Sequence, residues 1–181
     1  IDNTDPLGFD CQINEEEFLE YPPVNLIANV LNSRGMALER TKNLKGARED
    51  FEKAIQVNPA YANAYNNRGN IKSKQGDYAG AIEDYDLAIG LNVLFVEAHC
   101  NRGIAKESLG DLPGALADFD TAVELDSGYV DAYFRRARVK EHLGNHSGAL
   151  CDYDKVVELE PENKDKVAPF RNRIEAFDDS S

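Results

Sequence analysis

The sequence predicts an all-α solenoid: four helix–turn–helix repeats, followed by a helix that caps the last one. The first observation is a 34-residue period that runs without a gap through residues 28–61, 62–95, 96–129 and 130–163. The second is that small and aromatic residues keep their places in each copy, as Gly69, Ala81 and Tyr85 do in the second. A strict period of this length is typical of a solenoid whose unit is one supersecondary element.

Each copy is predicted to form two helices joined by a tight turn. In the second copy, Ala64 and Ile71 belong to the first helix, Gly76 breaks the chain, and Asp77 can cap the next helix. Since close approach of two helices needs small side chains, we expect them to cross where Gly69 meets Ala81. The second helix carries an apolar stripe at spacings of three and four residues, formed by Ala81, Ile82, Tyr85, Ala88 and Ile89.

Residues of these types, at these spacings and with this period, resemble the tetratricopeptide repeat. The resemblance covers 136 of the 181 residues, which is four copies of 34. It implies a right-handed superhelix whose concave groove is lined by the first helix of each copy. It also implies a non-catalytic scaffold that binds a peptide or an extended protein segment in that groove. In the first copy Lys42 replaces the turn glycine, and we expect Asn43 to cap the second helix there.

Residues 1–27 form an acidic N-terminal leader. They contain seven Asp and Glu and no Lys or Arg, so they hold more than half of the net charge of −13. Asn14 followed by Glu17 predicts a capping box for a short helix that carries Phe18, Leu19 and Tyr21. Two interpretations stay open: a solvated, partly disordered leader, or a segment that packs on the first repeat or in the groove.

Residues 164–181 are predicted to form a capping helix and a frayed tail. Val167, Phe170, Ile174 and Phe177 recur at helical intervals, and Pro169 suits a first helical turn. The last repeat of a solenoid exposes an apolar flank that must be covered, and this segment can cover it.

A charged pattern repeats together with the fold. An Arg precedes the helix-contact position of every copy, and an Asp precedes the aromatic residue of every second helix. Because Arg and Asp lie about equally far from the turn, we predict that they pair across each hairpin. Four Arg also suggest phosphate binding, but each comes with its own Asp, which favours the structural interpretation. The pairs are Arg34–Asp50, Arg68–Asp84, Arg102–Asp118 and Arg136–Asp152.

Polar residues gather on the face of the first helices that lines the groove in tetratricopeptide proteins. Asn carries both donors and acceptors, so a row of Asn suits the backbone of an extended peptide, while it is a mediocre helix former. We expect Arg138 to be the less neutralised cation, to receive an acidic or C-terminal carboxylate of the partner, and to have Phe134 beside it as an apolar contact. A plain hydrated surface is the alternative. The predicted peptide-binding residues are Asn63, Asn66, Asn67, Asn70, Asn101, Phe134, Arg135 and Arg138.

Two other functions stay open. In carboxylate-clamp tetratricopeptide domains, Lys, Asn and Arg side chains grip the C-terminal carboxylates of heat-shock chaperones. Asn70, Asn101 and Arg135 match that set, whereas Asn66 and Asp131 stand where the clamp has Lys. A clamp-like chaperone adaptor is therefore one alternative. The other is an assembly factor or self-associating scaffold that uses its convex face.

The composition argues against several classes of function. A net charge of −13 disfavours nucleic acid as a partner, and no apolar run reaches the length needed for membrane insertion. Neither the three His nor the three Cys have metal or catalytic spacing, and a glycine-rich phosphate loop is missing. We therefore expect no enzyme, no cofactor and no metal, and we expect Cys11, Cys100 and Cys151 to be reduced thiols.

Two features of the sequence bear on the location of the protein. The chain begins at Ile1 without an initiator Met or a signal-like segment, which favours a processed product. The repeat style also resembles tetratricopeptide proteins of photosynthetic organisms, including organellar assembly factors. We expect a soluble intracellular protein, with an organellar, chloroplast-like location after processing as one option.

Overall fold

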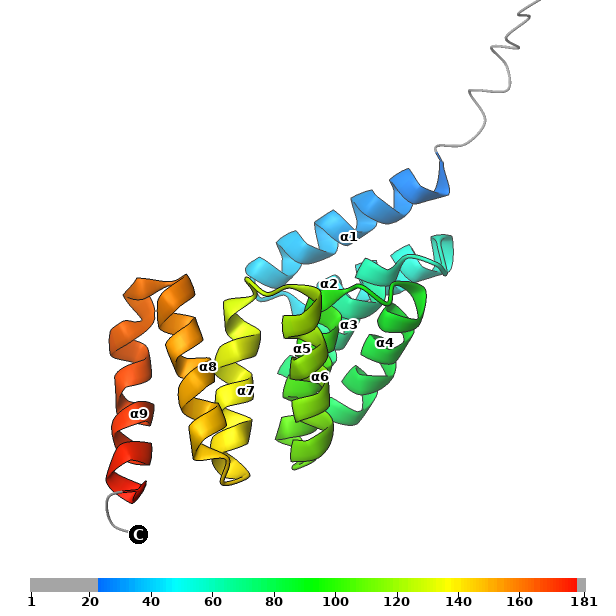
Figure 1. Ribbon diagram of the computed structural model, residues 1–181. Coiled ribbons are helices and arrows are strands. Elements are labelled where there is room, and N and C mark those ends of the chain that lie inside the picture. Colours follow the sequence, from blue (N-terminus) through cyan, green and yellow to red (C-terminus); the bar gives the residue numbers. More distant parts are fainter. Residues whose placement is uncertain (1–22, 179–181) are drawn as a thin grey trace, which may run out of the picture.

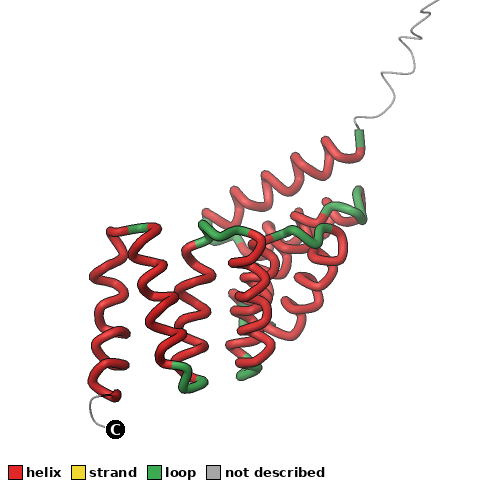
Figure 2. Tube along the Cα trace, viewed as in Figure 1, coloured by secondary structure: helices red, strands yellow, loops and turns green. Residues whose placement is uncertain are grey.

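The computed structural model describes residues 23–178, which form nine α-helices and one short 3-10 helix (Figure 1). Within this range there is no strand, and short loops join the helices (Figure 2). The elements are α1 (Val24–Arg40), α2 (Leu44–Val57), α3 (Ala62–Lys74), α4 (Tyr78–Leu91), α5 (Val96–Ser108), α6 (Leu112–Leu125), α7 (Val130–His142), α8 (His146–Leu159), η1 (Pro161–Asn163) and α9 (Lys164–Asp178).

Consecutive helices pair into hairpins: α1 with α2, α3 with α4, α5 with α6, and α7 with α8. Each hairpin contacts the next one through α2–α3, α4–α5 and α6–α7, and α9 lies against α8. Figure 1 shows the hairpins stacked in chain order, with α1 at one end of the stack and α9 at the other. The predicted all-α superhelix of helix–turn–helix repeats is confirmed.

The first helices of the hairpins line one surface of the stack. Besides their hairpin partners, α1, α3, α5 and α7 contact one another in succession. In a curved stack the elements on the inner side lie closest together. These helices therefore form the concave surface, and α2, α4, α6 and α8 form the convex one.

An Asn or Asp side chain caps the start of every second helix, as the sequence predicts. Oδ1 of Asn43 and Oδ1 of Asp77 accept a hydrogen bond from the backbone N–H three residues later, at 3.0 and 2.9 Å. Asp111 and Asn145 make the same contact in the last two hairpins. The turn before each cap needs a residue with positive φ. This residue is glycine in three hairpins and Lys42, with φ of 63°, in the first.

The small residue in each first helix leaves room for an aromatic ring. A Cβ added to Gly69 would lie 2.7 Å from Cε1 of Tyr85, and its three nearest atoms all belong to that ring. The first and third hairpins repeat this contact with a phenylalanine. The nearest side chain to Gly69 is thus the ring of Tyr85, for which the glycine makes space.

The first and last helices of the stack differ from the prediction in where they begin. α1 begins at Val24, so four residues that we assigned to the leader are helical. The predicted short helix with Phe18, Leu19 and Tyr21 lies outside the described residues. α9 begins at Lys164, but Pro169 lies inside it rather than in its first turn.

Candidate functional site

The predicted site residues lie on α3, α5 and α7, which are three of the helices that form the concave surface. Their surroundings differ strongly. Asn63 is exposed on the first turn of α3, whereas Asn66 is buried, with 6% of its surface exposed. Asn67, Asn70 and Asn101 are half-buried.

Four asparagines join three hairpins by side-chain hydrogen bonds. Nδ2 of Asn101 donates to Oδ1 of Asn66 at 3.1 Å, and Nδ2 of Asn66 reaches Oδ1 of Asn67 at 3.4 Å. Nδ2 of Asn67 donates in turn to Oδ1 of Asn32 on α1 at 2.8 Å. We call Asn32, Asn66, Asn67 and Asn101 the amide chain. Asn32 was not among the predicted site residues, and the others were predicted to contact a ligand rather than one another.

A hollow of about 280 Å³ opens between α3 and α5 beside the amide chain. The hydroxyl of Tyr85 donates to Oδ1 of Asn70 at 2.8 Å, and burial raises the pKa of Tyr85, so this hydroxyl keeps its proton. Nζ of Lys74 lies 2.5 Å from Oε1 of Glu39 on α1. The hollow is lined by Asn70, Ser73, Lys74, Tyr85, Asn101 and Ile104.

Phe134 belongs to the core rather than to the groove surface. It is only 9% exposed, and its ring lies edge-on to Tyr153 and to Phe170, with centroids at 6.0 and 5.5 Å. Phe170 comes from α9, which covers this end of the stack. The expected apolar contact between Phe134 and a ligand is therefore corrected, because α9 occupies the space beside the ring.

The two predicted groove arginines are both paired with acidic residues. Nη2 of Arg138 lies 3.5 Å from Oε1 of Glu107, which comes from α5 in the preceding hairpin. Nε of Arg135 lies 3.6 Å from Oδ1 of Asp131, four residues earlier. Arg138 is therefore not the less neutralised cation that we expected, because the stagger between hairpins brings Glu107 to it.

All four predicted Arg–Asp pairs are present in the hairpins. In the second, Arg68 donates through Nε and Nη2 to both carboxylate oxygens of Asp84, at 2.9 and 2.6 Å. Asp84 also accepts from Lys72, and the third and fourth hairpins repeat this second cation. The four aspartates are buried. Buried carboxylates with such partners are structural, so these arginines are not a phosphate site.

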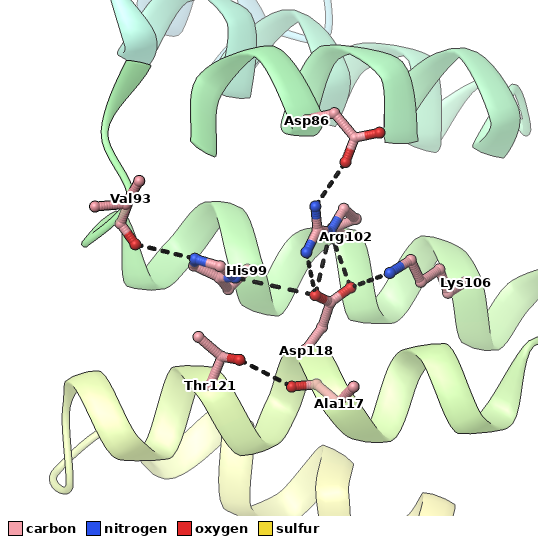
Figure 3. Close-up of polar contacts among 8 residues, drawn as sticks. All are labelled: Asp86, Val93, His99, Arg102, Lys106, Ala117, Asp118 and Thr121. Atoms are coloured by element: carbon pink, nitrogen blue, oxygen red, sulfur yellow. Dashed lines mark hydrogen bonds and ion pairs between the residues drawn. The ribbon is translucent and has the colours of Figure 1, made fainter. Parts of the chain in front are cut away.

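Further ion pairs connect one hairpin to the next. Figure 3 shows Arg102 between two carboxylates: its Nη1 reaches Asp86 of α4 at 2.6 Å, and its Nε and Nη2 hold Asp118 of α6. Arg136 bridges Asp120 and Asp152 in the same way in the last hairpin. The arginines thus stabilise both the hairpins and their stacking.

The His and Cys side chains of the described residues lie in different surroundings. His99 is 7% exposed and reaches the carbonyl of Val93. Cys100 and Cys151 are free thiols, and burial raises the pKa of Cys100 to about 12. Within residues 23–178, no group of three or more His, Cys, Asp and Glu could hold a metal ion. Likewise, none of the described helices has the length and apolarity to span a membrane.

The fold and its inner surface define a solenoid of helical hairpins with a polar concave face. This chain belongs to the tetratricopeptide repeat family. Models described as tetratricopeptide repeat match residues 62–92 and 100–164, and one described as TPR repeat matches residues 35–76. None of the curated proteins compared with this sequence matches it.

Three solved structures with similar folds illustrate the comparison. The Arabidopsis OM64 TPR domain is 28% identical, with a TM-score of 0.64, covering 66% of this chain and 98% of that one. The first TPR of Spaghetti (RPAP3) is 23% identical, with a TM-score of 0.65, covering 66% and 95%. MamA from Desulfovibrio magneticus RS-1 is 20% identical, with a TM-score of 0.67, covering 76% and 77%.

Proposed function

We propose that this protein is a non-catalytic interaction scaffold that binds an extended peptide segment of a partner protein along its concave surface. The observation that carries the proposal is the hollow between α3 and α5, whose lining includes several polar side chains. Family membership supports the scaffold role, because repeats of this kind stack into extended concave binding surfaces.

The hollow offers donors for the acceptors of a peptide. The ammonium group of Lys74 pairs with Glu39 and keeps two further N–H groups, and the amide nitrogen of Asn101 keeps one beyond its bond to Asn66. Asn70 carries a third nitrogen donor. The hydroxyl of Tyr85 already occupies the carbonyl oxygen of Asn70, so the amide nitrogen of Asn70 serves other acceptors. A backbone carbonyl or a carboxylate of the partner fits this set, and Ile104 adds an apolar contact.

One similar structure supports peptide binding by this fold, since the first TPR of Spaghetti is bound to the HSP90 peptide SRMEEVD. The clamp-like chaperone adaptor fits this chain less well. Asn66, which stands where a clamp has Lys, is buried in the amide chain, and Asp131 places a carboxylate at the other Lys position. We therefore favour a segment held by amides and by Lys74 over one held by clamp lysines.

Selection of displayed peptides on the intact chain tests the proposal. Selected peptides are titrated by fluorescence anisotropy against the natural chain, the double variant Asn70→Ala, Lys74→Ala, and the outer-face control Lys53→Ala. We expect the double variant to bind at least about tenfold more weakly and the control to bind equally well. Selection that enriches no peptide, or peptides that bind the double variant unchanged, would contradict the groove proposal.

The peptide SRMEEVD serves as a second probe in the same assay. It is compared with the same peptide carrying a C-terminal amide. We expect weak binding of both forms, because the clamp lysines are replaced. Tight binding that depends on the free carboxylate would instead favour the chaperone-adaptor function.

A further inference from the structure

The stretch from Gln75 to Asn101 has an unusual composition. It contains no Lys or Arg over 27 residues, in a chain that has 20 of them. Its acidic residues are Asp77, Glu83, Asp84, Asp86 and Glu97. Asp84 is neutralised inside the second hairpin and Asp86 contacts Arg102, whereas Glu83 is exposed on α4.

The same stretch exposes several large apolar side chains on the convex helix α4 and in the turn that follows it. Leu87 and Leu91 lie one helical turn apart on α4, with 50% and 44% of their surfaces exposed. Val93 and Leu94 follow in the turn to α5, at 66% and 67%. Gly90 is exposed beside them and adds no side chain. We call these five residues the outer patch. Contiguous apolar patches of this kind mark interaction sites on soluble proteins.

The fold does not require all of these apolar side chains, because the other three repeats have different residues at most of the equivalent positions. At the position of Leu87 they have Lys53, Thr121 and Lys155. At the position of Val93 they have Pro59, Ser127 and Pro161, and at that of Leu94 they have Ala60, Gly128 and Glu162. At the position of Leu91 they have the apolar residues Val57, Leu125 and Leu159, so the second repeat differs from the others at Leu87, Val93 and Leu94.

Hydrogen bonds hold the turn of the outer patch in one conformation. The backbone N–H of Phe95 donates to the carbonyl of Asn92 at 3.1 Å, and that of Leu94 donates to Oδ1 of Asn92 at 3.2 Å. Nε2 of buried His99 lies 3.1 Å from the carbonyl oxygen of Val93 (Figure 3). Since a carbonyl only accepts, Nε2 carries the proton. A rigid turn loses little entropy when a partner binds to it.

We propose that the outer patch is a second docking surface, separate from the groove, for an amphipathic helix of a partner protein whose apolar stripe is flanked by Lys or Arg. Leu87, Leu91 and Leu94 offer the apolar contact, and Gly90 lets a partner helix approach closely. Glu83 is exposed one turn before Leu87 on the same face, and the side chain of Asp86 is 54% exposed. Both carboxylates attract basic flanks, Glu83 more strongly because Asp86 already pairs with Arg102.

Charge argues against two other occupants of the outer patch. A second copy of this chain in a symmetric dimer would bring identical acidic borders together, which is unfavourable. An anionic membrane surface would be repelled by the same carboxylates. A basic amphipathic helix satisfies both the apolar and the charged parts of the surface.

A synthetic peptide tests this surface directly. The probe is a labelled helix-forming peptide with leucines at i, i+3, i+4 and i+7 and lysines on its flanks. Two controls have Glu in place of Lys, or the same composition with the leucines spread around the helix. The test variant is Leu87→Lys, Val93→Pro, Leu94→Glu. Each substitution copies another repeat, and together they leave the net charge unchanged.

We expect the test variant to bind the basic amphipathic peptide at least about tenfold more weakly than the natural chain does. The groove variant Asn70→Ala, Lys74→Ala should bind it unchanged, so failure of the groove proposal would not affect this test. If Val93→Pro lowers the melting temperature, the double variant Leu87→Lys, Leu94→Glu keeps the turn backbone intact and replaces it.

Four results would overturn the proposal. One is equal binding of the basic peptide to the natural chain and the test variant, and another is equal binding of the acidic and basic peptides. The other two come from sedimentation and from vesicle binding. A dimer of the natural chain that the test variant abolishes would assign the patch to a second copy. Binding to phosphatidylserine vesicles that the variant loses would assign it to a membrane.

Discussion

Asn101 on α5 donates a hydrogen bond from Nδ2 to Oδ1 of Asn66 on α3 at 3.1 Å, and Asn66 is 6% exposed. The bond connects the third hairpin to the second through side chains that also line the concave surface. An amide oxygen that is buried without a donor costs more free energy than one hydrogen bond contributes on average. The asparagines of the groove therefore stabilise the stack as well as shaping the surface that meets a ligand.

Replacing Asn101 by Ala should lower the free energy of unfolding by about 1–3 kcal/mol, because Oδ1 of Asn66 loses its donor. Urea unfolding followed by circular dichroism measures the change. Asn63→Ala is the matched control, since Asn63 is exposed on α3, and it should change stability by less than about 0.5 kcal/mol. Equal stability of the two variants would mean that the amide chain contributes nothing.

The buried aspartates should contribute differently to the free energy of unfolding in different hairpins. Asp84→Ala leaves Arg68 and Lys72, whose side chains are only 19% and 15% exposed, without their carboxylate. We expect a loss of about 3–5 kcal/mol, as for other buried ion pairs with one partner removed.

Asp50→Ala is the comparison for Asp84→Ala. Its partner Arg34 is 60% exposed and water can solvate the freed cation. The first hairpin also has Leu38 where the others have a second cation. We expect the loss of this ion pair to lower the free energy of unfolding less than the loss at Asp84 does. A loss at Asp50 as large as the loss at Asp84 would show that the second cation and its burial do not matter.

The lowered pKa of Asp50 leads to a prediction of how the free energy of unfolding changes in acid. The hydrogen bonds from Arg34 lower the pKa of Asp50 in the folded state. The group therefore stabilises the fold above its unfolded pKa of about 3.9, and this contribution is lost as the pH falls through the lower folded value. Asp50→Asn should flatten the decrease of stability below about pH 4. Urea titrations at several pH values would show parallel curves for the two proteins if Arg34 had no such effect.

The contacts within hairpins could be predicted from the sequence because they follow from the turn. Arg68 and Asp84 lie about equally far from Gly76, so an antiparallel hairpin brings them together whatever the curvature of the stack. The caps at Asn43 and Asp77 are local as well. An Asn or Asp directly before a predicted helix is enough to predict such a cap.

The contacts between hairpins could not be predicted in the same way. Asn67 reaches Asn32 over 35 residues, while Arg138 reaches Glu107 over 31. The period of 34 residues predicts neither offset, because each depends on the twist and stagger between hairpins. For this reason the predicted ligand residues Asn66 and Asn67 proved to bond to Asn101 and Asn32 of the neighbouring hairpins, and Phe134 proved to lie beneath α9.

At the end of the stack, α9 repeats a contact that earlier hairpins make with each other. Arg171 of α9 pairs with Asp154 of α8, as Arg136 pairs with Asp120 one repeat earlier. Val167 and Ile174 of α9 are buried. We therefore interpret α9 as a substitute for the first helix of a further repeat, whose outer side is polar and ends the stack.

Phe170→Ala tests this role of α9. The half-buried ring of Phe170 lies 5.5 Å from that of Phe134 and 5.6 Å from that of Tyr153, so its loss removes packing contacts from both rings. We expect the free energy of unfolding to fall by about 1–3 kcal/mol. The exposed neighbour Asn172→Ala should change it by less than about 0.5 kcal/mol. Removing residues 164–181 should in addition uncover Phe134 and Tyr153 and cause association, which light scattering after size exclusion detects. A shortened chain that stays monomeric and melts with the intact protein would show that the fourth hairpin needs no cap.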